Sequence, residues 1–147
     1  MNNLIMNSCW CPGPDGGPAY FSGAVATFDD FCIDDNRTCS ITQTADMQGY
    51  DQYDPLLPIT GGRRIRWGYI LRKIEGPHIL LQARFYSASG AVLDTQQEDI
   101  GCKVTAKFQR QMATFTAPRG AAKVQLSLHF AGKVTACTFY APMAYYC

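Results

Sequence analysis

The fold class is decided by residues 123–130, which read KVQLSLHF. Apolar side chains stand at every second position of this stretch, at Val124, Leu126, Leu128 and Phe130. Successive side chains of a β-strand point to opposite faces of the sheet. A period of two without exception therefore predicts a strand that buries one face and exposes the other.

The same alternation recurs in residues 65–72, 79–86 and 137–143. Glycine or proline supplies the turns between strands, at residues 75–77, 87–90, 117–120 and 131–133. Short strands at this spacing, with no long helical pattern, predict an all-β protein, a β-sandwich. Five aromatic side chains fall on the apolar sides and are expected in the core: Trp67, Phe85, Phe115, Phe130 and Phe139.

The chain has 147 residues, the size of one domain, so residues 1–147 are predicted to fold as a single unit. Within it, residues 1–18 are expected to form an N-terminal strand, at residues 4–6, and a connector rich in Cys, Pro and Gly. Further strands are expected at residues 24–28 and 39–43. Residues 46–62 are expected to form a long loop.

Composition excludes several classes of protein. Hydrophobic residues make up 47% and charged residues 17%, which is enough for a core and unlike a disordered chain. No apolar run is long enough to span a membrane. The net charge of +1 argues against a nucleic-acid binder.

Charge is unevenly distributed along the chain. Residues 1–60 carry eight acids and one base, and residues 61–147 carry twelve bases and four acids. Two interpretations stay open. The two halves interleave in one fold and neutralise each other, or a negative end of one molecule meets a positive face of the next.

Seven cysteines in this chain are an odd number, and the N-terminus shows no secretory signal peptide. The thiols are therefore free and buried, or bind metal, or reach an oxidising environment by another route such as lysis of the producing cell. The sulfurs lack the C-x₂-C spacing of zinc sites. Cys32 and Cys39 flank a six-residue loop and are predicted to pair within the chain.

The remaining cysteines include three near the chain ends. Cys9, Cys11 and Cys147 are the candidates for a disulfide to another subunit, and Cys102 and Cys137 complete the set. The alternative for all five is a reduced, buried side chain that acts as a small hydrophobe.

No catalytic motif is present. His78 and His129 have no partner at ligand spacing, and the acids at residues 29–30 and 34–35 cluster in one loop instead of facing each other across a cleft. We therefore expect no enzyme, no metal and no cofactor. Trp10, Tyr50 and Tyr53 are the aromatics expected at the surface, where they would stack on sugar rings or anchor a subunit interface.

Three segments resemble bacterial jelly-roll modules of the carbohydrate-binding type. Residues 3–10, NLIMNSCW, are similar to the start of such modules, and residues 84–93, RFYSASGAVL, to a strand followed by a glycine turn. Residues 115–128, FTAPRGAAKVQLSL, match the pattern F-x-A-P-x-G-A-x-x-V-x-L-x-L. The resemblance implies that residues 1–147 form a single-domain jelly-roll β-sandwich of antiparallel strands. Such modules often hold a structural calcium ion, but here Cys11 and the residues at 141–143 replace its acids, so we expect that site to be lost.

Three hypotheses follow. The leading one is a non-catalytic subunit that assembles head-to-tail with copies of itself into a disulfide-linked extracellular or spore-surface fibre, a device that resembles the endospore-appendage pilins. The rival is a stand-alone module that binds a glycan through exposed aromatics. The third is a cytosolic protein with seven reduced thiols.

Overall fold

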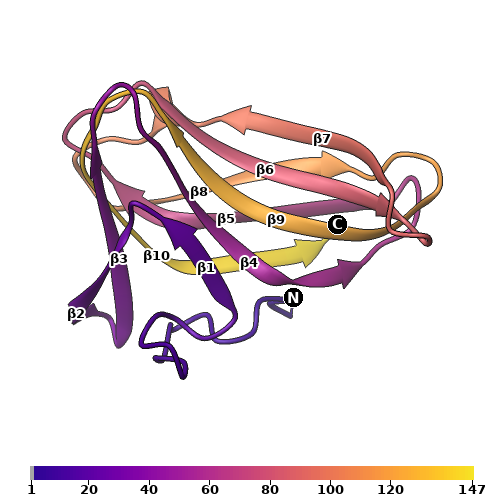
Figure 1. The fold of residues 1–147 in the computed structure, drawn as a ribbon, viewed down its shortest axis with the longest axis horizontal. Helices are drawn as coiled ribbons and strands as arrows, with labels where there is room; N and C mark the ends of the chain where they lie inside the picture. Colours follow the sequence, from indigo (N-terminus) through magenta and orange to yellow (C-terminus); the bar gives the residue numbers. More distant parts are fainter. Residues whose placement is uncertain (1) are drawn as a thin grey trace.

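The computed structural model describes residues 2–147 as two five-stranded antiparallel sheets packed face to face (Figure 1). The first sheet holds β1 (Phe21–Ala24), β4 (Gln48–Pro58), β9 (Ala121–Ala131), β6 (His78–Ser87) and β7 (Val92–Asp99), in that order. The second holds β2 (Thr27–Ile33), β3 (Asn36–Gln43), β10 (Val134–Tyr146), β5 (Arg64–Arg72) and β8 (Gln109–Thr116). One 3₁₀ turn, η1 (Gly101–Lys103), follows β7. The predicted all-β sandwich is confirmed.

The core lies between the sheets and contains the alternate residues that the sequence pattern assigns to it. In β9 the buried set is Val124, Leu126, Leu128 and Phe130, and each is fully buried. The same holds for Ile79, Leu81, Ala83 and Phe85 of β6, which pairs with β9 in antiparallel register. The five aromatics expected in the core are all buried.

The first half of the chain departs from the prediction. The expected loop at 46–62 is mostly β4, and the expected strand at 24–28 is broken at Val25, whose φ of 74° separates β1 from β2. The inward positions of β4 include Gly49 and Asp51, which hide its alternation. A Cβ at Gly49 would lie 2.2 Å from Ile41 Cδ1 and 2.7 Å from Gln43 Oε1, so a larger residue would displace these two side chains.

The two ends of the chain run together, although residues 4–6 do not form the predicted strand. The backbone N–H of Leu4 donates to the carbonyl of Ala144 in β10 (2.7 Å), and Asn3 exchanges two further hydrogen bonds with the backbone of the same strand. These bonds hold the N-terminal segment against β10, although the two do not pair as β-strands.

Trp10 and Tyr53 are core residues, which corrects the expectation that they lie at the surface. Trp10 is 0% exposed, and its ring contacts those of Phe21 (centroids 5.4 Å apart), Phe139 (5.8 Å) and Tyr69 (6.0 Å). Tyr53 is 1% exposed and packs on Phe21. The prediction failed for Tyr53 because its segment was expected to be a loop and is the strand β4, and for Trp10 because residues 7–18 have no periodicity. Positive φ angles at Asn7 and Trp10 turn the chain inward there.

A polar bridge joins the two sheets inside the core. The hydroxyl of Tyr69 in β5 donates to Asp51 Oδ2 in β4 at 2.8 Å. Both side chains are fully enclosed, and burial raises the pKa of Asp51 to about 7. Burial, followed by the charge of Asp51, also raises the pKa of Tyr69.

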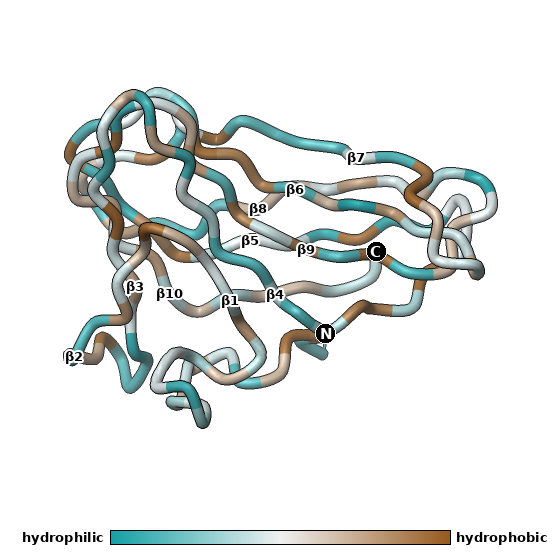
Figure 2. Tube along the Cα trace, viewed as in Figure 1, coloured by the Kyte–Doolittle hydropathy of each residue, from teal (hydrophilic) through white to brown (hydrophobic). Residues whose placement is uncertain are grey.

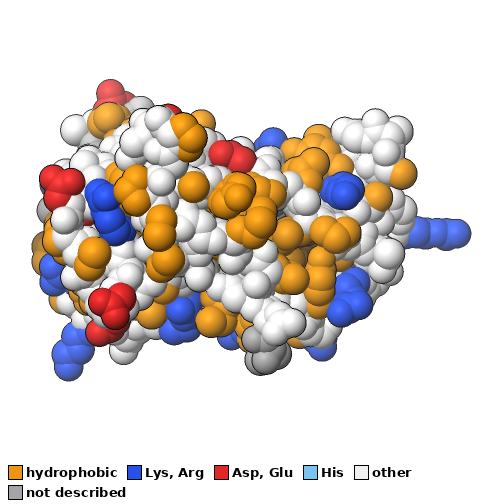
Figure 3. Space-filling view, turned by 90° about the horizontal axis from the view of Figure 1, so that it is seen from below, with side chains coloured by type: hydrophobic (Ala, Val, Ile, Leu, Met, Phe, Trp, Pro, Cys, Tyr) orange, Lys and Arg blue, Asp and Glu red, His pale blue; other side chains and the backbone are white. Residues whose placement is uncertain are grey.

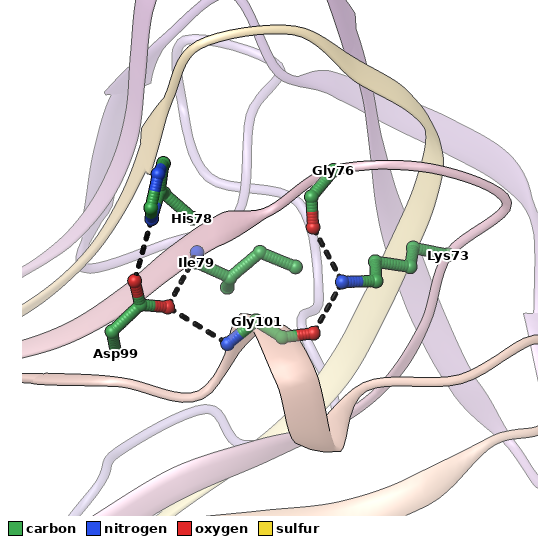
Figure 4. Close-up of polar contacts among 6 residues, drawn as sticks. All are labelled: Lys73, Gly76, His78, Ile79, Asp99 and Gly101. Atoms are coloured by element: carbon green, nitrogen blue, oxygen red, sulfur yellow. Dashed lines mark hydrogen bonds and ion pairs between the residues drawn. The ribbon is translucent and has the colours of Figure 1, made fainter.

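A second polar cluster closes one end of the sandwich (Figure 4). Asp99 accepts hydrogen bonds from His78 Nδ1 (2.7 Å) and from the backbone N–H groups of Gly101 (2.9 Å) and Ile79 (3.3 Å). Lys73 Nζ donates to the carbonyls of Gly76 and Gly101. Burial alone would raise the pKa of Asp99, but the bonds from His78 and the two N–H groups outweigh it and lower that pKa.

We expect Trp10→Ala to lower the free energy of unfolding by about 3–5 kcal/mol, the usual loss for a large aromatic deleted from a core. Urea denaturation measures it. Tyr20→Ala is the matched control, because Tyr20 lies in the same segment and is 50% exposed. A change at Trp10 no larger than the one at Tyr20 would show that the indole is not part of the core.

We expect Asp51 to make stability fall as the pH rises. Its folded pKa of about 7 lies above the ordinary value of 3.8, so the folded state holds a proton that the unfolded state releases. The stabilisation is fully present below pH 3.8 and is lost as the pH rises through about 7, a change on the order of 4 kcal/mol. Thermal melts at pH 5 and pH 8 test this. In Asp51→Asn, which keeps an acceptor for Tyr69, the difference between the two melting temperatures should shrink.

Candidate functional site

The outward side of the first sheet carries an unusual set of side chains, which we call the amide face. Its centre consists of Gln52 of β4, Gln82 of β6, Gln97 of β7, and Gln125 and Ser127 of β9. Each alternates with a buried apolar or core-facing neighbour, so the strand pleat places all five on the same side of the sheet.

Strand register aligns four of these residues in one row across the sheet. Ser127 pairs with both Gln52 and Gln82, and Gln82 pairs with Gln97. Gln97 Nε2 donates to Gln82 Oε1 (2.8 Å), and Gln82 Nε2 donates to Ser127 Oγ (3.2 Å). Ser127 Oγ in turn lies 2.8 Å from His129 Nε2. This continuous chain of hydrogen bonds fixes the rotamers of the row.

The two central side chains of the row are covered by their neighbours. Gln82 is only 6% exposed and Ser127 only 2% exposed, although both point away from the core. Side chains that face outward are enclosed to this degree only when their neighbours stand higher on the sheet. Arg84 and Tyr86 of β6 and Tyr50 and His129 at the other end are the half-buried neighbours.

Aromatic rings bound the row on two sides. Tyr50 stacks on His129, with centroids 5.9 Å apart and planes at 25°. Tyr86 Oη donates to Gln125 Oε1 (3.3 Å), beside a hollow of about 580 Å³ that is also lined by Asp54 and Lys123. Tyr50 pairs with His129 of β9, and Tyr86 pairs with Lys123 of the same strand. These two positions are six residues apart, which is about 20 Å along the strand.

His129 contributes a neutral ring at neutral pH. Burial lowers the pKa of His129, and the nearby charge of Arg84 lowers it further. A neutral imidazole both donates and accepts, so it extends the polar chain of the row.

Of the three aromatics expected at the surface, only Tyr50 reaches this face. Trp10 and Tyr53 belong to the core. The residues that sequence reasoning missed are the glutamines, Arg84 and Tyr86, together with a role for His129. A signal was present, because four of the eight outward positions in residues 79–86 and 123–130 hold an amide or an aromatic ring, at Gln82, Tyr86, Gln125 and His129.

The cysteines lie away from the amide face, and all seven are free. Cys39 and Cys137 are buried in the core, which raises the pKa of both thiols, to about 12 for Cys137. The predicted Cys32–Cys39 bond is not made: Cys32 is exposed and pairs with Arg37 in the ladder, whereas Cys39 pairs with Phe28. Cys9, Cys11, Cys102 and Cys147 are exposed.

Four of the twelve acidic residues lie on the hairpin of β2 and β3. Asp29 accepts hydrogen bonds from Thr38 and Ser40, and Asp30 pairs with Arg37 at 3.6 Å. In Figure 3 acidic side chains lie toward the end of the molecule that carries this hairpin, whereas basic side chains lie at both ends. The uneven charge along the sequence therefore does not become an acidic end and a basic end on this face.

Residues 2–147 contain neither a metal-ligand cluster nor a membrane-spanning helix. No group of three or more His, Cys, Asp or Glu side chains converges as metal ligands do among these residues. Within the same range, no helix has the length and apolar character needed to cross a membrane.

Comparison with known proteins identifies the fold. No family model and no curated protein matches the sequence. Among solved structures, the enzymatically active domain of tailspike protein 4 of bacteriophage CBA120 superposes with a TM-score of 0.69 at 12% identity, over 99% of this chain and 21% of that one. The chain also spans only about a quarter of an arabinofuranosidase and of a xylanase chain that includes a family 22 module.

Free-standing modules match over nearly their whole length. The CBM22-1 xylan-binding domain of Paenibacillus barcinonensis Xyn10C has a TM-score of 0.60 at 12% identity, over 99% of this chain and 94% of that one. A family 4 carbohydrate-binding module has a TM-score of 0.55 at 15% identity, over 97% and 99%. The chain therefore has the jelly-roll fold of carbohydrate-binding modules.

Proposed function

We propose that this protein is a non-catalytic module that binds a neutral polysaccharide chain on the amide face. The observation that carries the proposal is the outward-facing chain of hydrogen bonds that runs from Gln97 through Gln82 and Ser127 to His129, between Tyr50 and Tyr86.

The chemistry of the row fits sugars. Each sugar hydroxyl donates and accepts, and so does each amide, hydroxyl and neutral imidazole of the row. Aromatic rings supply flat apolar surfaces for the C–H faces of pyranose rings. Because the row is already fixed by its own hydrogen bonds, little side-chain entropy remains to be lost on binding.

The charge of the face favours a neutral ligand. Arg84 and Lys123 are balanced by Asp54 and Asp99 at its rim, so no cluster of cations awaits an acidic glycan. The family 22 neighbour is described as xylan-binding, which supports the same class of ligand for a chain with the same fold. An extracellular or surface location, where such polymers occur, belongs to this proposal.

Trp10 and Tyr53 serve neither the glycan hypothesis nor the fibre hypothesis. Each was a candidate surface for stacking on sugar and equally a candidate anchor against another copy, and both are buried in the molecule's own core. The exposed cysteines near the chain ends, Cys9, Cys11 and Cys147, are the feature on which self-assembly would still depend.

Affinity electrophoresis in gels that contain soluble xylan, mixed-linkage β-glucan, hydroxyethylcellulose or galactomannan tests the proposal. We expect at least one polymer to retard the protein. Gln82→Ala and Tyr86→Ala should each weaken binding about tenfold or more, because each removes a hydrogen-bonding or stacking group at the centre or end of the row.

Two matched variants control for general effects. Gln109→Ala and Tyr145→Ala change the same residue types on β8 and β10 of the second sheet and should leave retardation intact. If Gln82→Ala lowers the melting temperature, the more exposed Gln97→Ala replaces it. No retardation by any of the four polymers, or retardation that survives all changes on the amide face, would overturn the proposal.

We expect binding to be independent of pH above 7 and to weaken in acid. Because the pKa of His129 is lowered, its ring is neutral at pH 7 and becomes charged only below the ordinary value of 6.5. Both nitrogens of the protonated ring are donors, so the ring can no longer accept a hydrogen bond at the end of this chain of hydrogen bonds. Titration of the retarding polymer at pH 5 and pH 8 measures this, and His129→Gln should remove the difference.

A further inference from the structure

Two exposed thiols meet at the start of the chain, away from the amide face. Cys9 Sγ and Cys11 Sγ lie 3.7 Å apart, on either side of the buried Trp10. This is the only sulfur–sulfur contact that residues 2–147 make. To form a disulfide bond, the two sulfurs would have to approach from 3.7 Å to about 2.05 Å.

The turn that carries the thiols is held by Asn7. Its Oδ1 accepts from the N–H of Cys11 (2.8 Å), its Nδ2 donates to the carbonyls of Cys11 and Ala19 (3.0 Å each), and its own carbonyl accepts from the N–H of Trp10 (2.9 Å). Trp10 adopts a left-handed φ of 60°. This backbone arrangement brings both sulfurs to the same side without any contribution from the thiols themselves.

We propose that Cys9 and Cys11 form a reversible disulfide with each other, and that this bond locks the turn that places Trp10 in the core. The oxidant is a small-molecule disulfide. One cysteine thiolate attacks it, forms a mixed disulfide and releases one thiol. The second thiolate then attacks the mixed disulfide, closes the Cys9–Cys11 bond and releases a second thiol, and the two protons lost by the cysteines end on the two released thiols.

The pairing within one chain is favoured over a bond to another subunit by proximity. A partner sulfur 3.7 Å away within the same turn has a far higher effective concentration than a sulfur on a second molecule. The hydrogen bond and the like charge of Cys9 raise the pKa of Cys11, so exchange is best followed at pH 8.

The bond would act on the core through Trp10. The carbonyl of Cys9 accepts from the N–H of Arg37 at the start of β3 (3.1 Å), and the indole lies between Phe21 of the first sheet and Phe139 of the second. Closing the ring restricts the unfolded chain and keeps Trp10 in its left-handed conformation. Oxidation should therefore raise the melting temperature by about 2–4 °C.

The test incubates the full chain at pH 8 with oxidised or reduced glutathione, blocks the remaining thiols by alkylation and cleaves before aspartate. Cleavage at Asp15 isolates residues 1–14, which contain Cys9 and Cys11 and no other cysteine. After oxidation we expect this peptide without alkyl groups and about 2 Da lighter than its dithiol form, and after reduction we expect it alkylated twice. Thermal melts of both preparations accompany the mass spectra.

Each other outcome overturns the proposal. Two glutathione adducts or two alkyl groups after oxidation would show that the thiols do not pair. A link from this peptide to another copy or to a different peptide would show an intersubunit or long-range bond instead. An unchanged melting temperature with the bond formed would refute the lock. Cys102→Ser, an exposed cysteine elsewhere, should preserve the shift, and Cys9→Ser and Cys11→Ser should each abolish it.

Discussion

The pairing of β6 with β9 over a completely buried inner surface constrains the rest of the molecule. Their eight inward side chains, from Ile79 to Phe85 and from Val124 to Phe130, have no exposed area. Burying each large one stabilises the fold by about 1.5–3 kcal/mol. A slip of one residue would turn the whole set outward, so the register is fixed. The position of every outward residue on these two strands follows from that register.

The amide face is a consequence of this constraint together with the curvature of the sheet. Once Leu81 and Leu128 point inward, Gln82 and Ser127 must point outward and stand opposite each other. Their low exposure requires partners, because a buried polar group without a hydrogen bond is destabilising. Gln97 supplies a partner from within the row, and His129 supplies one from beside it. The row is therefore stable without a ligand.

Sequence alone predicted the strands whose alternation is intact and failed where another requirement replaced it. β4 was missed because Gly49 avoids Ile41 and Asp51 bridges to Tyr69, so two inward positions are not apolar. β7 is an edge strand, almost wholly hydrophilic (teal in Figure 2), and has no apolar period to detect. The burial of Trp10 depends on contacts with Phe21 and Phe139, which are distant in sequence and invisible to any local pattern.

The division of side chains between core and surface also shapes the recognition that we propose. Most large aromatics are used inside, where Trp10, Tyr53, Trp67 and Tyr69 fill the sandwich, and the amide face retains Tyr50 and Tyr86 at its ends. Stacking tolerates many sugars, whereas fixed hydrogen bonds distinguish the orientation of each hydroxyl, because a mismatch leaves a polar group of the row unpaired. On a face built in this way, the proposed binding would depend on the directions of hydrogen bonds more than on the burial of apolar area. Its selectivity among polysaccharides should therefore be high relative to its affinity.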